Sequence, residues 1–167
     1  RNRELLITAY ITYVRPVLEY NTHIWSPVYK THVDLIERVQ RRFTKMLDGL
    51  HALSYPDRLA VTGLESLELR RLKSDLCMYF KIINGQTCLS ADEYFKFDCS
   101  VKLTRTSSNR KLVKPRYNTD LLKHNFFVRV VDAWNSLPIH VREAKSCKKF
   151  NSLLQCIDFK KFLVGSY

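Results

Sequence analysis

The stretch VDLIERVQRRFTKML, residues 33–47, constrains the fold most strongly, because its apolar residues recur with the period of an α-helix. At 3.6 residues per turn they share one side of the helix: Leu35, Ile36, Val39, Phe43, Met46 and Leu47. The opposite side carries Arg38, Arg41, Arg42 and Lys45. We predict a helix that begins near Thr31 and buries its apolar side. The basic side admits three interpretations: a solvated surface, a membrane-surface helix, or one wall of a nucleic-acid groove.

Helical periodicity extends through most of the chain, which holds only four glycines and five prolines in 167 residues. So few turn-forming residues favour long helices over a β-sandwich. The predicted helices are 2–20, with a kink or break at Arg15–Pro16, then 54–63, 66–84, a turn at 92–97, 125–138 and 146–159. Ser54 and Ser146 are the expected caps, and Gly63 and Gly85 are the expected stops after the helices 54–63 and 66–84. Trp25 and Trp134 are the expected core anchors.

The stretch SVKLTRTSSNRKLVKPRYNTDLLKHNFF, residues 100–127, lacks this periodicity. RKLVKPRY (110–117) and TDLLKHNF (119–126) look like two short extended runs that flank a turn near Asn118. We therefore predict a small β-hairpin there, and a fold that is mostly α, a multi-helix bundle with this hairpin in its C-terminal half.

The chain is strongly basic, with 28 Lys and Arg against 16 Asp and Glu and a formal net charge of +12. Between Lys102 and Arg129, eight basic residues accompany a single acid, Asp120. A field of this sign attracts polyanions, so we expect phosphate contacts from Arg105, Arg110, Lys111, Lys114, Arg116 and Lys123. A solvated basic loop is the alternative. In residues 33–47, Asp34 and Glu37 precede Arg38 and Arg41 by four residues, the spacing of intrahelical ion pairs.

Several functional classes lack support in the sequence. No apolar run approaches the length of a membrane span, and no phosphate-binding or nucleophile motif occurs. Two-metal chemistry needs converging carboxylates, yet Asp92 and Glu93 are the only adjacent acids. The five cysteines are widely spaced without a CxxC pair, which favours reduced thiols over a metal site. We expect no active site, no cofactor and no small-molecule substrate in this chain.

Six segments in order resemble a known family: YVRPVLEY (13–20), IWSP (24–27), DLIERVQRRFTKM (34–46), LSYPDRLAVTGLESLELRRLKSDL (53–76), YFKIING (79–85) and FFVRVVDAWNSLP (126–138). They resemble the C-terminal part of reverse transcriptases from non-long-terminal-repeat, LINE-type retrotransposons of the jockey and chicken-repeat kind. The resemblance covers roughly residues 5–155.

The resemblance implies a domain plan. Residues 1–50 look like the helical thumb, residues 51–160 like the C-terminal extension with its basic hairpin at about 102–125, and residues 161–167 like a tail. Because residue 1 is an arginine inside a helical pattern, we expect a longer reading frame. Its upstream fingers and palm would carry the catalytic aspartates and Mg²⁺ of an RNA-directed DNA polymerase.

The resemblance also implies a function. The chain would hold RNA and RNA–DNA hybrid by backbone contacts without catalysing the reaction. The basic side of residues 33–47 would face the hybrid and bind it through Arg38, Arg41, Arg42 and Lys45. The chain's partners would be the nucleic acid and the palm and fingers of the parent chain, with no membrane. Its location would be intracellular, in the cytoplasm and nucleus. The alternative is a domesticated or decayed remnant that acts as a protein-interaction module or has no function.

Overall fold

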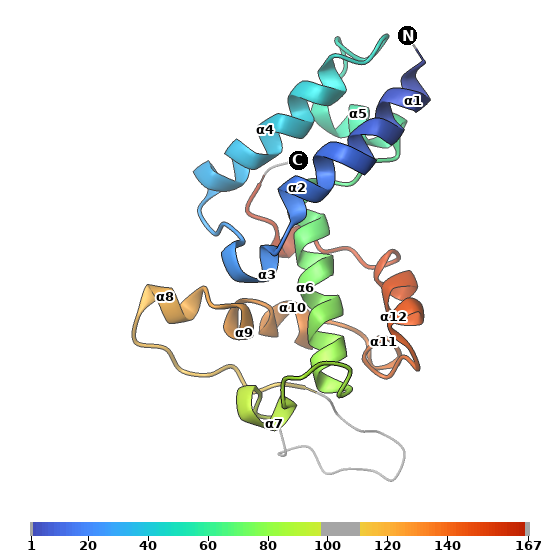
Figure 1. The fold of residues 1–167 in the computed structure, drawn as a ribbon. Helices are drawn as coiled ribbons and strands as arrows, with labels where there is room; N and C mark the ends of the chain where they lie inside the picture. Colours follow the sequence, from blue (N-terminus) through green and yellow to red (C-terminus); the bar gives the residue numbers. More distant parts are fainter. Residues whose placement is uncertain (1, 98–110, 166–167) are drawn as a thin grey trace. The chain divides into compact units, whose positions relative to one another are not determined.

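The computed structural model describes residues 2–97 and 111–165, and their regular structure is almost entirely helical (Figure 1). The chain divides into two compact units. Unit 1 comprises Arg1–Arg71 and Leu163–Tyr167, and unit 2 comprises Leu72–Phe162. Helix α6 (Leu67–Ile83) begins in unit 1 and continues into unit 2.

Unit 1 opens with three consecutive helical segments: α1 (Arg3–Ala9), the π-helix η1 (Tyr10–Val14) and α2 (Arg15–Glu19). The Asn2 side chain caps α1 by accepting from the backbone N–H of Glu4 at 3.1 Å. The predicted interruption at Pro16 takes the form of a widened π turn. Proline has no N–H to donate to the preceding turn, and the extra residue of a π turn carries the helix past it.

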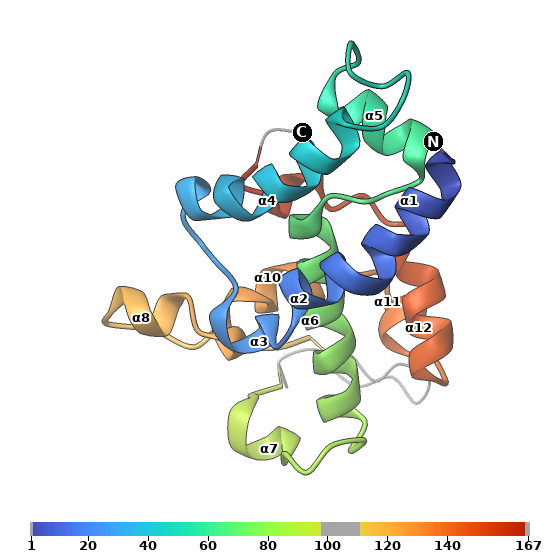
Figure 2. The same cartoon turned by 45° about the horizontal axis from the view of Figure 1, so that its top comes forward.

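The next part of unit 1 holds α3 (Thr22–Trp25), α4 (Lys30–Lys45) and α5 (Tyr55–Thr62), and Figure 2 shows α1, α4 and α5 in this unit from a second direction. Helix α5 confirms its predicted ends: the Ser54 hydroxyl accepts from the Asp57 N–H, and Gly63 adopts a left-handed φ of 66°. The expectation that Trp25 is a core anchor is wrong, because Trp25 is 42% exposed. Its indole N–H donates to the Tyr20 carbonyl at 2.7 Å, which holds the ring near the surface.

Unit 2 contains the rest of α6 and a series of short helices: α7 (Ala91–Tyr94), α8 (Asp120–Lys123), α9 (Phe126–Arg129), α10 (Val131–Asn135), α11 (Ile139–Arg142), α12 (Cys147–Leu154) and the 3-10 turn η2 (Lys160–Phe162). Its core is aromatic. Trp134 is fully buried, as predicted, with its ring 6.2 Å from that of Tyr79 and 5.9 Å from that of Phe150. The predicted helix 125–138 is divided at Val130 into α9 and α10.

The predicted β-hairpin is wrong for the residues that the structure describes. The run 119–126 begins with α8, because the Thr119 side chain accepts from the Leu122 N–H and so caps a helix. In the run 110–117, the described part forms one isolated antiparallel bridge, between Phe97 and Leu112. The Leu112 backbone is otherwise paired with a side chain: its N–H donates to Asn135 Oδ1 at 2.9 Å and its carbonyl accepts from Asn135 Nδ2 at 2.8 Å.

Candidate nucleic-acid interface

The inward face of α4 is mostly polar, so the helix is turned about its axis from the predicted orientation, although its basic side remains exposed. Its buried residues are Val33, Glu37, Gln40 and Thr44. Three of the residues assigned to the core, Leu35, Val39 and Met46, are instead 52%, 40% and 68% exposed. The prediction was right only for Leu47, which is buried, and in part for Ile36 and Phe43, which are half-buried.

Glu37 explains much of this orientation. Its carboxylate accepts from the backbone N–H of Leu67, with each oxygen 3.1 Å from the nitrogen, and also from the Tyr55 hydroxyl. Burial raises the pKa of Glu37, while the hydrogen bonds from Tyr55 and from the backbone of Leu67 and Glu68 oppose that rise. A carboxylate with this many donors is tolerated in the interior.

Gln40 and Thr44 continue the polar face with full hydrogen bonding. The Tyr10 hydroxyl donates to Gln40 Oε1 at 3.0 Å, and Gln40 Nε2 donates to the Tyr55 hydroxyl at 3.0 Å and to the Glu65 carbonyl at 2.8 Å. One turn later, Arg58 Nε donates to the Thr44 hydroxyl at 3.1 Å. These bonds offset the cost of removing amide and hydroxyl groups from water.

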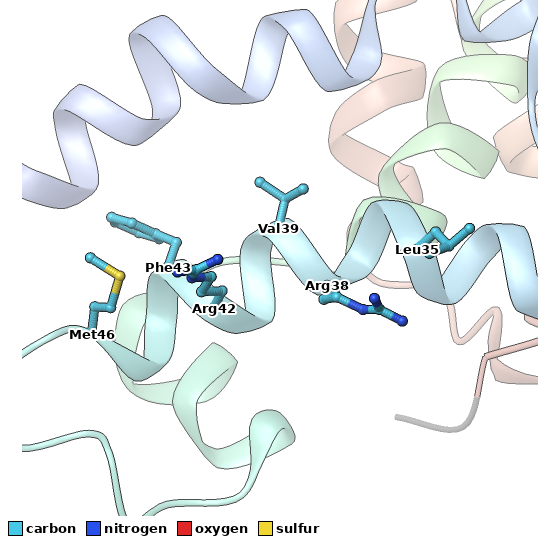
Figure 3. A pocket seen from close by; sticks show the side chains of 6 residues that line it. All are labelled: Leu35, Arg38, Val39, Arg42, Phe43 and Met46. Atoms are coloured by element: carbon cyan, nitrogen blue, oxygen red, sulfur yellow. The ribbon is translucent and has the colours of Figure 1, made fainter.

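The outward face of α4 carries two parallel stripes. Arg38, Arg42 and Lys45 recur at intervals of four and three residues, so they form one exposed basic row along the helix. No ion pair joins them to an acid within the described part of the chain. Beside this row lies an open hollow whose walls come from α4 itself (Figure 3): Leu35, Arg38, Val39, Arg42, Phe43 and Met46.

Arg41, the fourth basic residue predicted for this surface, belongs to a different environment. It forms an ion pair with Asp34, Nη2 to Oδ1 3.2 Å, and its guanidinium lies 5.2 Å from the centre of the Tyr55 ring. The predicted partners are therefore wrong: Asp34 binds Arg41 rather than Arg38, and Glu37 is turned inward. Arg41 is half-buried and is the least accessible of the four.

The predicted cations of the C-terminal half lie in unit 2 where they are described. Lys111, Lys114, Arg116 and Lys123 are all exposed, the first three on the irregular segment before α8 and the fourth on α8 (Figure 1). Lys114 forms an exposed ion pair with Asp132. Arg105 and Arg110 lie outside the described residues. In unit 1 the fold thus brings Arg38, Arg42 and Lys45 into one row.

Two other kinds of site find no support in the described residues. Across 2–97 and 111–165, no three His, Cys, Asp or Glu side chains gather where they could hold a metal ion. Over the same residues, no helix combines the length and apolar character that crossing a bilayer requires. The basic row on α4 is therefore the best-defined candidate interface.

Comparison with known proteins adds one weak similarity. The chain is 27% identical, over 88 residues, to an uncharacterised protein of Caenorhabditis elegans. The match covers 51% of this chain and 44% of the nematode protein, so it spans less than half of that relative. No protein-family model and no solved structure matches the chain.

Proposed function

We propose that this chain is a non-catalytic nucleic-acid-binding part of a LINE-type reverse transcriptase, and that it holds RNA or RNA–DNA hybrid by the sugar–phosphate backbone. The observation that carries the proposal is the exposed row of Arg38, Arg42 and Lys45 on α4, without an acid paired to it in the described residues. The six-segment resemblance supports the choice of polymer. Polymerisation and its Mg²⁺ would belong to the palm of the parent protein, a domain outside this chain.

The geometry of the row suits phosphates. From Arg38 to Lys45 the helix rises roughly 10 Å, which matches about three nucleotides of one strand at ~3.4 Å each. Arginine presents a planar fork that bonds two phosphate oxygens, whereas lysine acts as a point charge. Contacts of this kind carry no sequence information, so binding is expected to be insensitive to sequence.

The cations of the segment 111–123 extend the proposal to unit 2. Lys111, Arg116 and Lys123 are exposed, and asparagine and threonine side chains that also donate to phosphate lie between them. We propose that they bind the same polymer, together with Lys114, whose exposed pair with Asp132 contributes at most about 1 kcal/mol and yields to a phosphate.

The test compares two triple variants of equal charge. R38Q/R42Q/K45Q removes the row on α4, and K145Q/K148Q/K149Q removes three exposed lysines around the start of α12. Fluorescence anisotropy of labelled RNA–DNA hybrid is measured at several salt concentrations. The α4 variant is expected to reduce the slope of log affinity against log salt by about 2 to 3, because roughly one counterion is released per phosphate contact. Equal losses of hybrid affinity and of salt dependence in both variants, or no binding by the wild type, would contradict the proposal.

A second function is favoured by the apolar stripe of the same face. Leu35, Val39 and Met46 are exposed side by side along the hollow, and phosphate does not need them. An amphipathic helix of a partner protein, with acidic residues beside its apolar side, would cover the apolar stripe and the basic row at once. This chain would then act as a protein-interaction module. If L35S/V39S/M46S leaves hybrid binding at the wild-type level, the apolar stripe is free for such a partner.

A further inference from the structure

The N-terminal helices of unit 1 expose two tyrosine rings to solvent. Tyr13 is 76% exposed and Tyr20 is 78% exposed, and neither ring contacts another aromatic ring in the described part of the chain. Val17, also exposed, lies between them, and the three residues recur at intervals of four and three. That spacing gathers them on one side of the helix, and we call them the tyrosine stripe.

The tyrosine stripe begins one turn away from the hollow on α4. The ring of Tyr10 stacks on that of Phe43, with 4.3 Å between centres and 9° between planes, and Phe43 lines the hollow. Figure 3 shows Val39 and Phe43 pointing from α4 toward the ribbon of the N-terminal helices. Residues 20–29 lead from the end of α2 to the start of α4, so the helices run antiparallel. One turn beyond the stack therefore leads to Tyr13 on one helix and to Val39 on the other.

Both helices turn these exposed side chains away from the interior of unit 1. On α4, Glu37 and Gln40 point inward and bond to Tyr55, while on α2 the Glu19 carboxylate pairs with Arg70. The opposite sides of the two helices form one outer surface. It combines the tyrosine stripe, the apolar stripe of α4 and the basic row, and it is made of these residues: Tyr13, Val17, Tyr20, Leu35, Val39, Met46, Arg38, Arg42 and Lys45.

We infer that this outer surface binds single-stranded nucleic acid: phosphates lie along the basic row, and unpaired bases stack on Tyr13 and Tyr20. The inference rests on the proposed function, because the same row binds the backbone, and it deepens that function by naming an unpaired strand as the ligand. A duplex presents phosphates but keeps the faces of its bases stacked inside. Only an unpaired strand uses the row and the apolar residues together.

The dimensions of the surface suit such a strand. From Tyr13 to Tyr20 the helix rises roughly 10 Å, which equals the rise of the basic row and the length of about three stacked nucleotides. Helices packed side by side have axes about 8–10 Å apart, a gap that long arginine side chains and a nucleotide span together. Stacking on tyrosine tolerates any base, since every base has a flat π face. Binding therefore remains insensitive to sequence.

The experiment compares three labelled probes with the full chain by fluorescence anisotropy at one salt concentration. They are a single-stranded RNA of mixed sequence, an abasic strand with the same number of phosphates, and RNA–DNA hybrid. The wild type should bind the RNA strand at least about 5-fold more tightly than the abasic strand, because stacking of even one base contributes this much. Trp25 is an intrinsic reporter, since its indole N–H donates to the Tyr20 carbonyl. Its emission should be quenched more by the RNA strand than by the abasic strand.

Two variants of the tyrosines separate the ring from the hydroxyl. Y13A/Y20A should abolish the preference for the RNA strand over the abasic strand, whereas Y13F/Y20F keeps both rings and should retain the preference. Y13A/Y20A should leave hybrid binding within about twofold, because contacts to a duplex backbone do not need the rings. The control L5A/V61A removes two exposed apolar side chains outside the surface and should bind all three probes as the wild type does.

Three results would overturn the inference. Equal affinity of the wild type for the RNA and abasic strands would leave the apolar stripe of α4 to a protein partner. A loss in Y13F/Y20F as large as in Y13A/Y20A would assign the effect to the hydroxyl groups, and an equal loss in L5A/V61A would make it unspecific. In each case, hybrid binding that still weakens in R38Q/R42Q/K45Q would leave the proposed function intact. Absence of wild-type binding to every probe would overturn both.

Discussion

The carboxylate of Glu37, on α4, receives the backbone N–H of Leu67, the first residue of α6. Glu37 is fully buried, and the N–H of Glu68 points at the same carboxylate. The first N–H groups of a helix have no partner within it and carry partial positive charge, so a carboxylate is a fitting acceptor. This contact joins residues 30 positions apart and fixes the beginning of α6 in unit 1.

Replacing Glu37 with leucine should destabilise the protein strongly. The change fills similar space but leaves the Leu67 and Glu68 N–H groups and the Tyr55 hydroxyl without their acceptor. Each unsatisfied buried donor costs about 1–3 kcal/mol, so we expect a loss of at least about 3 kcal/mol in the free energy of unfolding. Urea denaturation measures it, with the exposed Glu93→Leu as control. A loss for E37L no larger than for E93L would contradict the assignment.

Glu37 should also make stability depend on pH in a defined direction. Its pKa is raised by burial, so the folded state holds the proton more tightly than the unfolded chain does. The resulting stabilisation is fully present below the ordinary pKa near 4.5 and is lost as pH rises through the higher folded value. Relative to E37Q, the wild type should therefore become less stable across that window. If the wild type instead becomes more stable relative to E37Q as pH rises, the pKa of Glu37 is lowered in the folded state.

Local rules predicted several helix ends correctly, although the last helix, predicted over 146–159, already ends at Leu154. Ser54, Gly63, Gly85 and Ser146 all mark helix ends as expected, because caps and left-handed turns depend on a few neighbouring residues. The hairpin failed for the same local reason, since the Thr119 side chain caps a helix where extended structure was expected. The composition of residues 119–126 alone does not distinguish a capped helix from an extended strand.

The orientation of α4 could not be derived from periodicity. Counting apolar residues assigned Leu35, Val39 and Met46 to the core, but the buried face is chosen by partners distant in sequence: Tyr10, Tyr55, Arg58 and the start of α6. The one available signal was the recurrence of Val33, Glu37, Gln40 and Thr44 at helical spacing. The basic row itself was predicted correctly as a surface feature for Arg38, Arg42 and Lys45.

Substitutions on the exposed side of α4 should cost much less stability than substitutions on its buried side. L35S, V39S and M46S change exposed side chains, so each should alter the free energy of unfolding by no more than about 0.5 kcal/mol. L47A, by contrast, removes a buried side chain of the same helical region and should cost about 2–5 kcal/mol. Thermal and urea denaturation provide the comparison. Losses above about 2 kcal/mol for the exposed positions would restore the orientation that periodicity suggested.

Unit 2 offers a buried ion pair whose disruption should be costly. Arg129 Nη2 lies 2.9 Å from Asp75 Oδ2 and Arg129 Nε lies 3.1 Å from it, and the two side chains are only 15% and 4% exposed. Removing one partner leaves a charge in a site poor in water, which costs about 3–5 kcal/mol. D75N should therefore lower the free energy of unfolding by several kcal/mol.

The exposed pair of Lys114 and Asp132 is the matched control for that change, because D132N makes the same chemical substitution where the side chains are 40% and 56% exposed. Exposed pairs contribute about 0–1 kcal/mol, so D132N should be nearly neutral. The double variant D75L/R129M should recover part of the loss of D75N, since an apolar pair leaves no uncompensated charge. Urea denaturation decides: equal effects of D75N and D132N would mean that water reaches Asp75 and Arg129 freely.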